Sequence, residues 1–281
     1  RRLFEPEEAS LAVHLTLLAE PPRVIARRAG LDVGETSARL ERMARKGLVY
    51  QTGREDGGPF KYMALQFVIG VWEFQVNRLT PELIRDVNEY MEEFLEAGGW
   101  KTAPQLRTIP VGRSLSGGAG SLPYERAEEL VGRAKRALVA PCICRRERDL
   151  MGDGCGRLSE ACLIFGNAVD IYLRNGLGRL IARNEAQDIL READRQGLVL
   201  QPMNSRDSVN ICCCCGCCCG VLRNLRRQPR PLDFISSAFR VELDPSLCQG
   251  CGLCLTRCQM DALCLKDKRV RLDPEIGRAH V

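Results

Sequence analysis

Residues 210–220 read NICCCCGCCCG, which places seven cysteines in the eight positions from Cys212 to Cys219. Successive side chains of an extended strand point to opposite faces, so these seven thiols cannot all meet one metal ion. Gly216 interrupts the run and permits a sharp turn, which would gather thiols from both halves. The run therefore predicts a turn between two cysteine-bearing segments that cannot form one ordinary site, so some thiols must be spare, bridging or part of a larger cluster.

The chain holds 16 cysteines among 281 residues, and their meaning depends on the redox compartment. Disulfide-dense scaffolds are usually short and secreted. This chain is long, and it shows neither an export signal nor about 18 consecutive apolar residues. We therefore expect a cytoplasmic protein without a membrane span, in which metal or cluster ligation is favoured over disulfides. The net charge of +5 suits an acidic redox partner and nucleic acid equally well.

A second group of cysteines lies in PCICRRERDLMGDGCGRLSEACLIFG (141–166), with the spacing C-x-C-x10-C-x6-C: Cys142, Cys144, Cys155 and Cys162. Glycines on both sides of Cys155 let the loop bend, so these four thiols can close one tetrahedral set. Nearby arginines would lower the thiol pKa values and balance the charge of a cluster: Arg145, Arg146, Arg148 and Arg157. The spacing alone leaves zinc and iron–sulfur open.

The third group, in LCQGCGLCLTRCQMDAL (247–263), has the spacing C-x2-C-x2-C-x3-C: Cys248, Cys251, Cys254 and Cys258. Bacterial ferredoxins ligate 4Fe–4S clusters with this spacing. Gly250 and Gly252 relieve strain in the tight loops, so thiolates and backbone N–H groups can converge. Zinc sites usually have two separated cysteine pairs. The motif therefore favours iron–sulfur here, and its proximity favours iron–sulfur in the middle region too.

This C-terminal segment resembles the two-cluster ferredoxin-like module, with Gln259 where that family usually has proline. In that module the fourth cysteine ligates the other cluster, so the resemblance implies that Cys258 serves a second motif beyond residue 274. Residues 275–281 read as a translated sequencing adapter, so we expect the chain to be a gene fragment and this tail to lie outside the fold. Cys264 stands at an apolar strand position and is expected to be a buried thiol.

The order of segments over most of residues 6–274 resembles 4Fe–4S ferredoxin-type proteins of anaerobic bacteria with a winged-helix-like start. The resemblance implies one or more 4Fe–4S clusters and electron transfer with a redox protein or an oxidoreductase complex. The family pattern commonly has Asn at the position of Cys213, so the resemblance makes Cys213 the weakest candidate ligand of the run. It implies that the other thiols of the run are ligands: Cys212, Cys214, Cys215, Cys217, Cys218 and Cys219. Eleven cysteines in the middle region exceed the eight that two cubanes need, so an additional, unusual iron–sulfur cluster is a further candidate.

Residues 1–68 predict a winged-helix-like domain: a helix over 6–20, a helix ending at Gly30, a third helix with Ala38, Leu40 and Met43 on one face, and strands at 48–50 and 61–65 around a hairpin tip at 54–60. The third helix would offer DNA four basic side chains: Arg39, Arg42, Arg45 and Lys46. Residues 1–66 carry a net charge of only +2, which is a weak phosphate footprint, and such domains also dock proteins.

The remaining segments predict an α+β chain. A connector at 69–135 contains a helix capped by Thr80 and Pro81, and after the glycine-rich turn at 117–120 a further helix runs to 140. Residues 136–235 form a helical Cys-rich cluster domain, in which a helical stretch over 171–202 brings the run beside the first four cysteines. Residues 236–274 form the ferredoxin-like 4Fe–4S module.

The leading functional hypothesis is an iron–sulfur electron carrier that relays electrons to or from an oxidoreductase partner. The alternatives are a redox-responsive winged-helix regulator, with DNA as its partner, and a reductase that uses an unusual cluster. We find no Ser/His/Asp set, no pair of acid–base carboxylates and no nucleotide-binding loop. A carrier or an oxidoreductase subunit is therefore expected, and no catalytic residue is assigned.

Overall fold

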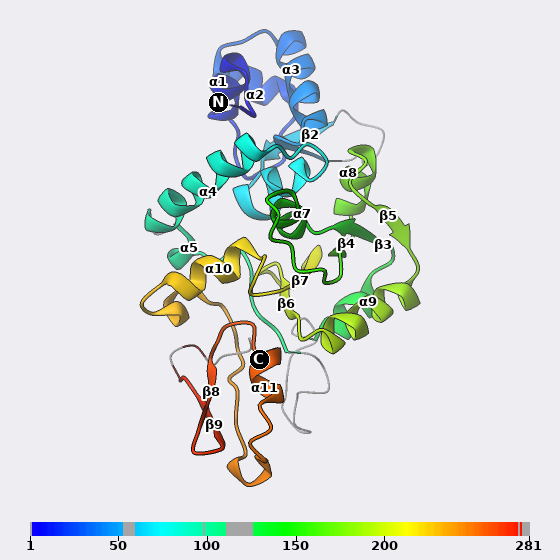
Figure 1. Cartoon of the computed structure of the whole chain (residues 1–281). Helices are drawn as coiled ribbons and strands as arrows, with labels where there is room; N and C mark the ends of the chain where they lie inside the picture. Colours follow the sequence, from blue (N-terminus) through cyan, green and yellow to red (C-terminus); the bar gives the residue numbers. More distant parts are fainter. Residues whose placement is uncertain (1, 53–59, 98, 111–125, 275, 277–281) are drawn as a thin grey trace.

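The computed structural model describes residues 2–52, 60–97, 99–110, 126–274 and 276 (Figure 1). Helices and short strands alternate along the chain, which confirms the α+β class. Within these ranges, no helix is both long enough and apolar enough to cross a membrane. The glycines at 117–120, the hairpin tip at 54–59 and the tail at 277–281 lie outside the described residues.

The N-terminal part has the predicted order of elements: α1 (Pro6–Ala12), α2 (Pro22–Ala29), α3 (Val33–Arg45), β1 (Val49–Thr52) and β2 (Lys61–Ala64). Gly30 ends α2 in the left-handed conformation, with φ of 69°, which favours glycine. Leu40 and Met43 are fully buried beneath the antiparallel β1–β2 pair. Ala38 is exposed, however, and Thr36 takes its place on the inner face of α3.

The first helix is shorter than predicted, because the chain after Ala12 pairs with β2 instead of continuing the helix. The N–H of Glu20 donates to the carbonyl of Tyr62 at 2.9 Å, and the N–H of Ala64 donates to that of Thr16 at 2.8 Å. Leu18, expected on the buried face, is consequently 74% exposed. A tertiary strand contact therefore overrides the helical spacing of this segment.

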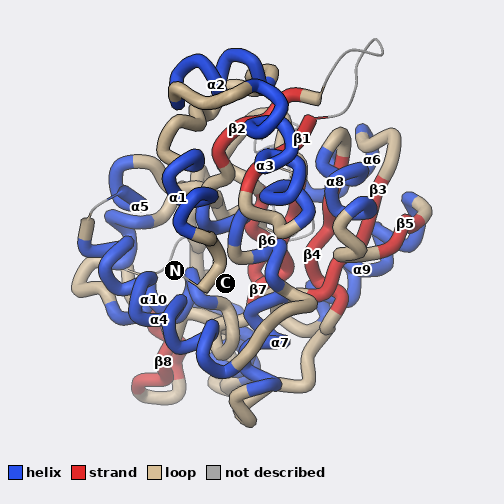
Figure 2. Tube along the Cα trace, turned by 90° about the horizontal axis from the view of Figure 1, so that it is seen from above, coloured by secondary structure: helices blue, strands red, loops and turns tan. Residues whose placement is uncertain are grey.

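The middle of the chain forms a five-stranded antiparallel sheet with strand order β5-β3-β4-β7-β6 (Figure 2). Its strands are β3 (Ala137–Pro141), β4 (Glu160–Phe165), β5 (Arg179–Ile181), β6 (Val199–Pro202) and β7 (Asn210–Cys214). The surrounding helices are α6 (Ala127–Arg133), α7 (Ile143–Leu150), α8 (Ala168–Arg174), α9 (Arg183–Arg195) and α10 (Gly220–Arg227). Because α9 packs against β3, β4 and β6, one face of the sheet is covered.

Two predicted helices are wrong in part, since strands of this sheet interrupt them. The helix expected to reach residue 140 ends at Arg133 and is followed by β3. The helical stretch over 171–202 is divided into α8 and α9 by β5, which pairs with β3. At Gly178 a Cβ would overlap the carbonyl oxygen of Val139, so the two backbones approach more closely than another residue would permit.

The connector contains α4 (Pro81–Glu96) and α5 (Gly99–Thr102). The hydroxyl of Thr80 accepts the N–H of Leu83 at 3.2 Å, which confirms the predicted cap. A short 3₁₀ turn at Glu73–Gln75 precedes α4. Val87 and Met91 on α4 belong to the same apolar core as the cysteine-bearing strands, so this helix helps to cover them.

The C-terminal segment forms α11 (Leu253–Arg257) and a hairpin of β8 (Leu263–Lys266) and β9 (Arg269–Leu272). Leu263 is buried, whereas Cys264 is exposed, which corrects the prediction of a buried thiol. Side chains alternate along β8, and in this two-stranded sheet the face that carries Cys264 is left uncovered. Cys258 and Met260 instead pack into the core that contains Cys214.

Gly216 lies where the cysteine run meets this C-terminal segment, and a Cβ there would overlap the backbone carbonyl of Gln259. We expect Gly216→Ala to lower the free energy of unfolding by about 1–3 kcal/mol, because the packed backbone must move. Gly220→Ala is the matched control, since its Cβ would meet no atom within 4 Å. Anaerobic urea denaturation measures both variants, and equal effects would contradict the predicted close packing at Gly216.

Candidate metal centre

The alternation of side chains along β7 divides the cysteine run between the two faces of the sheet. Cys212 and Cys214 lie on one face, in one apolar core with Cys162 of β4, whose Cα pairs in register with that of Cys212. Ile211 and Cys213 pack into the core on the opposite face. The thiols of β7 therefore cannot all face one site, as the sequence pattern predicts.

The first group, here called the cavity thiols, surrounds a cavity of about 70 Å³ between α7, α10 and the sheet. Its members are linked by hydrogen bonds in which each thiol donates to the next: Cys142, Cys144, Cys219, Cys214, Cys212 and Cys162. Donation to a neighbouring thiol, together with burial, raises the pKa of Cys142, Cys212 and Cys214 well above the usual value. The raised pKa values keep Cys142, Cys144, Cys212, Cys214 and Cys219 protonated without metal, and a bound cation would displace those protons.

The other walls of the cavity are mainly apolar, with six polar or charged side chains among them: Glu73, Asn88, Arg145, Glu147, Tyr172 and Asn224. Tyr172 is 5% exposed, and its hydroxyl has no hydrogen-bond partner among the described residues. Burial raises the pKa of Glu73 to about 7, although its carboxylate accepts the N–H of Gly70 at 2.7 Å. Asn88 donates to Glu147 at 3.1 Å. The cavity therefore offers thiols on one side and a few protonatable groups on the other.

The second group, here called the four-thiol group, consists of Cys155, Cys215, Cys217 and Cys218, whose sulfur atoms all lie within 4.8 Å of one another. The sulfurs of Cys155 and Cys215 are 3.9 Å apart, and those of Cys217 and Cys218 are also 3.9 Å apart. Cys215 also lines the cavity, so the two groups are neighbours. Four thiols at this separation suit a metal ion.

The structure divides the four cysteines of the 142–162 segment, which the spacing had suggested could form one set. Cys142, Cys144 and Cys162 line the cavity, whereas Cys155 joins the other half of the run. Cys213 belongs to neither group, and burial raises its pKa to about 12. The grouping thus depends on pairings across 60 residues of sequence, which the local spacing does not encode.

Two of the four predicted arginines lie at the thiols. Arg145 is 3% exposed and donates to the carbonyls of Leu158 and Cys213 at 2.7 and 2.9 Å. Burial disfavours the charged form of the Arg145 guanidinium. The electrostatic interactions with Cys142, Cys215 and Cys214 outweigh this effect and raise the pKa of Arg145. Arg157 donates to the sulfur of Cys217 at 3.0 Å. Arg146 and Arg148 instead bond Asn77 and Asp153.

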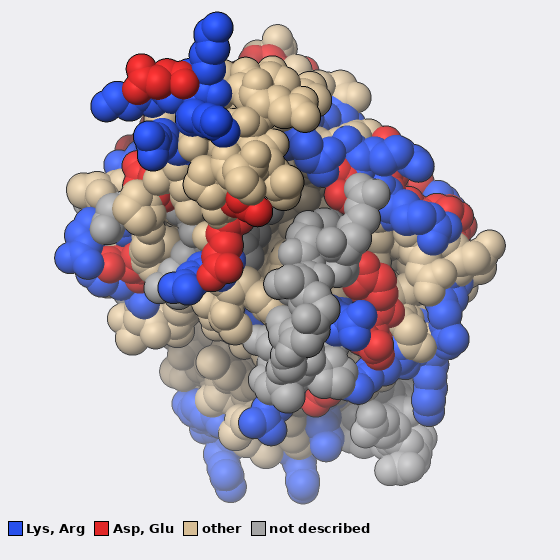
Figure 3. Space-filling model, turned by 90° about the horizontal axis from the view of Figure 1, so that it is seen from below, with Lys and Arg blue, Asp and Glu red and all other residues tan. Residues whose placement is uncertain are grey.

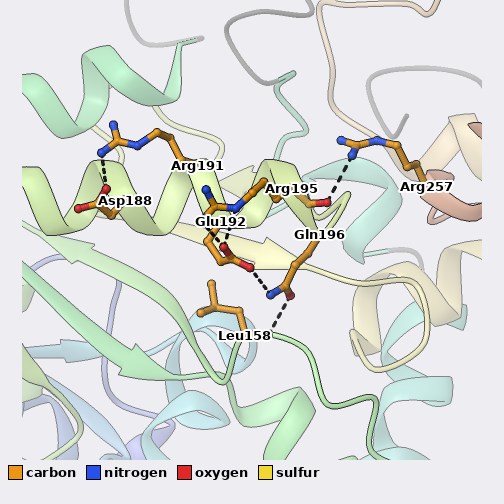
Figure 4. Close-up of polar contacts among 7 residues, drawn as sticks. All are labelled: Leu158, Asp188, Arg191, Glu192, Arg195, Gln196 and Arg257. Atoms are coloured by element: carbon orange, nitrogen blue, oxygen red, sulfur yellow. Dashed lines mark hydrogen bonds and ion pairs between the residues drawn. The ribbon is translucent and has the colours of Figure 1, made fainter.

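The end of α9 holds two cysteine-bearing segments together (Figure 4). The side-chain oxygen of Gln196 accepts the N–H of Leu158 at 3.0 Å, which fixes the loop that follows Cys155. Arg257 donates to the carbonyl of Asp194 at 2.7 Å and to its carboxylate at 3.1 Å. The helix therefore connects the Cys155 loop to the third cysteine group.

In the third group, the backbone donates to two of the four sulfurs. The N–H of Val270 lies 3.3 Å from the sulfur of Cys248, and that of Ala262 lies 3.3 Å from that of Cys258. The first of these bonds, with a second from Gly250, lowers the pKa of Cys248. Gly250 and Gly252 have φ of 71° and 78°, as the tight loops require. Cys251 is exposed and Cys254 half-buried.

Gln259 makes contacts near the thiols that the sequence does not reveal. Its side-chain oxygen accepts the N–H of Gly216 at 2.9 Å, and its amide donates to the carbonyl of Arg257 at 3.1 Å. The residue is 5% exposed. It therefore joins the third cysteine group to the turn of the run, a contact between residues 43 positions apart that no local signal predicts.

Glutamates neutralise most of the basic face of α3. Arg39 pairs with Glu35 at 2.6 Å, Lys46 pairs with Glu8 at 2.9 Å, and Arg45 pairs with Glu41. Arg42 is exposed. At the opposite end of the molecule, seen in Figure 3, basic side chains are also interspersed with acidic ones. Neither region presents a concentrated phosphate-binding field.

No protein-family model, curated protein or solved structure matches the chain. The function must therefore be inferred from the thiols and their surroundings.

In the metal-free chain, Cys155 should be alkylated before its three neighbours. Burial opposes its ionisation, but donation from the N–H of Arg157 and from the other thiols lowers its pKa to about 6. Burial raises the pKa of Cys217 and Cys218. Iodoacetamide at pH 7, followed by peptide mass spectrometry, should label Cys155 first, and the rate should fall about tenfold at pH 5, where the thiolate is lost. Faster labelling of Cys218 would contradict the assignment.

Proposed function

We propose that this protein is an iron–sulfur electron-transfer protein that holds one cluster among the cavity thiols and one at the Cys248–Cys258 motif. A redox protein or oxidoreductase complex would exchange electrons with it. When bound, such clusters accept and release single electrons. The observation that carries the proposal is the packing of the two cysteine groups in one core, in which Cys258 of the motif lies with Cys214 and Cys219 of the cavity thiols.

The cavity suits a cluster in its donor set and its charge. Six thiols supply more ligands than a single ion can use, and their burial keeps water away. The guanidinium of Arg145 offsets negative charge at Cys142 and Cys214. The unpartnered hydroxyl of Tyr172 is available to donate to a group in the cavity. A buried polar atom without a partner is costly in an empty site, and a bound cluster would remove that cost.

The third group supports a second, more exposed site. Its backbone N–H···S bonds stabilise thiolates and are among the interactions that set cluster potentials. Leu247 precedes the motif and Leu253 lies within it, and they are 76% and 69% exposed, so two apolar side chains stand at the surface beside the thiols. Weak redox encounters use small surfaces of this kind. Electrons would therefore pass between a partner at this surface and the cavity thiols beneath it.

A reductase is the second candidate, and the cavity favours it. Beyond the thiols, the cavity is lined by Trp72, Met91 and Glu73, and the carboxyl of Glu73 has a pKa of about 7. Such a group can exchange protons near neutral pH. The winged-helix regulator has less support, because the glutamates on and beside α3 neutralise three of its four basic residues.

Anaerobic reconstitution with iron and sulfide tests the proposal. We expect more than about four irons per chain with matching sulfide, and two distinct EPR signals after reduction. Cys214→Ser should remove the signal of the cavity cluster, and Cys251→Ser should remove that of the motif. Cys264→Ser is the control, since this thiol is exposed and outside all three groups.

Fewer than about four irons per chain would exclude two clusters. A single signal that survives Cys214→Ser would exclude the cavity as a cluster site. Turnover of a small oxidant by the protein, lost in Glu73→Gln with iron retained, would favour the reductase over the carrier.

A further inference from the structure

The four-thiol group is distinct from both proposed cluster sites. Three of its members, Cys215, Cys217 and Cys218, come from the turn after β7, and Cys155 comes from the loop between α7 and β4. We propose that this group binds a single zinc ion in tetrahedral coordination. The ion would be structural and would hold the Cys155 loop against the cysteine run. The inference does not depend on clusters in the cavity or at the motif.

The distances between the sulfurs indicate one ion instead of a cluster. Zinc–sulfur bonds of about 2.3 Å in a tetrahedron place the sulfurs about 3.8 Å apart. The sulfur of Cys155 lies 3.9 Å from that of Cys215, the sulfurs of Cys217 and Cys218 are also 3.9 Å apart, and no pair exceeds 4.8 Å. In a cubane each thiolate binds a different iron, so its four sulfurs must stand further apart. The group therefore has the size of a mononuclear site.

The charges around the group suit four thiolates on a divalent ion, which together carry two negative charges. Arg157 donates its guanidinium to the sulfur of Cys217 at 3.0 Å and its backbone N–H to that of Cys155. The charge of Arg145 acts on Cys215 from the buried side. Two cations thus offset the net charge, and these contacts orient the ligands as outer partners do in metal sites.

The coordination would be closed, which favours a structural ion over a catalytic one. Four thiolates leave no position for water or substrate, and structural zinc sites have this composition. Cys215 and Cys218 are buried, whereas Cys217 is exposed and gives the ion an entry path. The site would close a loop between residues 155 and 215. A constraint over such a length restricts the unfolded chain strongly.

Metal analysis of the full chain, purified anaerobically with iron–sulfur clusters in place, tests the inference. We expect one zinc per chain in addition to iron, and zinc X-ray absorption that fits four sulfurs at about 2.3 Å. Cys155→Ser and Cys217→Ser should each weaken zinc retention by at least about tenfold, while iron and sulfide persist. Cys264→Ser should retain zinc. Circular dichroism verifies that the Cys217→Ser variant, whose substituted side chain is exposed, remains folded.

Absence of zinc from the wild-type chain, one iron in its place, or zinc retention in both variants would overturn the inference. The inference would also be overturned if the wild-type chain contains no zinc and the Cys155→Ser variant loses iron and sulfide, because the four thiols would then hold a cluster. A chain with zinc but without iron would remove the proposed electron-transfer function and leave the zinc site standing, so the two failures are distinguishable.

Discussion

Successive side chains of β7 point to opposite faces of one sheet, and the arrangement of the thiols depends on this constraint. Cys212 and Cys214 face the cavity with Cys162, while Cys213 packs against the other core. Beyond Cys214 the strand ends and the chain turns, so the remaining cysteines are released from strict alternation. Cys219 then returns to the cavity at the start of α10, whereas Cys217 and Cys218 stay with Cys155. The strand positions Cys212, Cys213 and Cys214, and the turn beyond it separates the remaining thiols, so a run that looks like low complexity is divided between two sites.

Gly216 connects this division to the rest of the molecule. Its N–H is bonded by Gln259, and its missing side chain leaves room for the carbonyl of the same residue. The contact brings the third cysteine group, which includes Cys258, into the core of the cavity thiols. The end of α9 reinforces it, since Arg257 and the Cys155 loop are both held there. Electron transfer between the groups would use this packed junction, because tunnelling requires short and rigid separations.

The sequence predicted correctly those helix ends that depend on a residue at the end itself, such as a glycine or a capping hydroxyl. Gly30 ends α2 and Thr80 caps α4, as expected. The errors occur where distant strands compete with helical spacing, as in the pairing of Glu20 with Tyr62 and of β5 with β3. The same limit applies to the site. The sequence pointed to the cysteines as candidates and to four arginines, of which Arg145 and Arg157 lie at the thiols. The partition of the thiols arises from contacts 60 residues apart, which spacing rules do not contain.

A redox-inactive metal site next to a cluster would limit the structural change that accompanies electron transfer. A cluster changes its charge with each electron, and the change alters the hydrogen bonds and repulsion felt by its ligands. A zinc ion has no redox chemistry, so a zinc site in the four-thiol group would keep the same geometry in every state. Cys215 belongs to that group and also lines the cavity, and Cys214 precedes it directly. An ion of fixed charge would therefore keep one edge of the cavity in place while the neighbouring cluster is oxidised and reduced. The cavity thiols would then rearrange little between the two oxidation states.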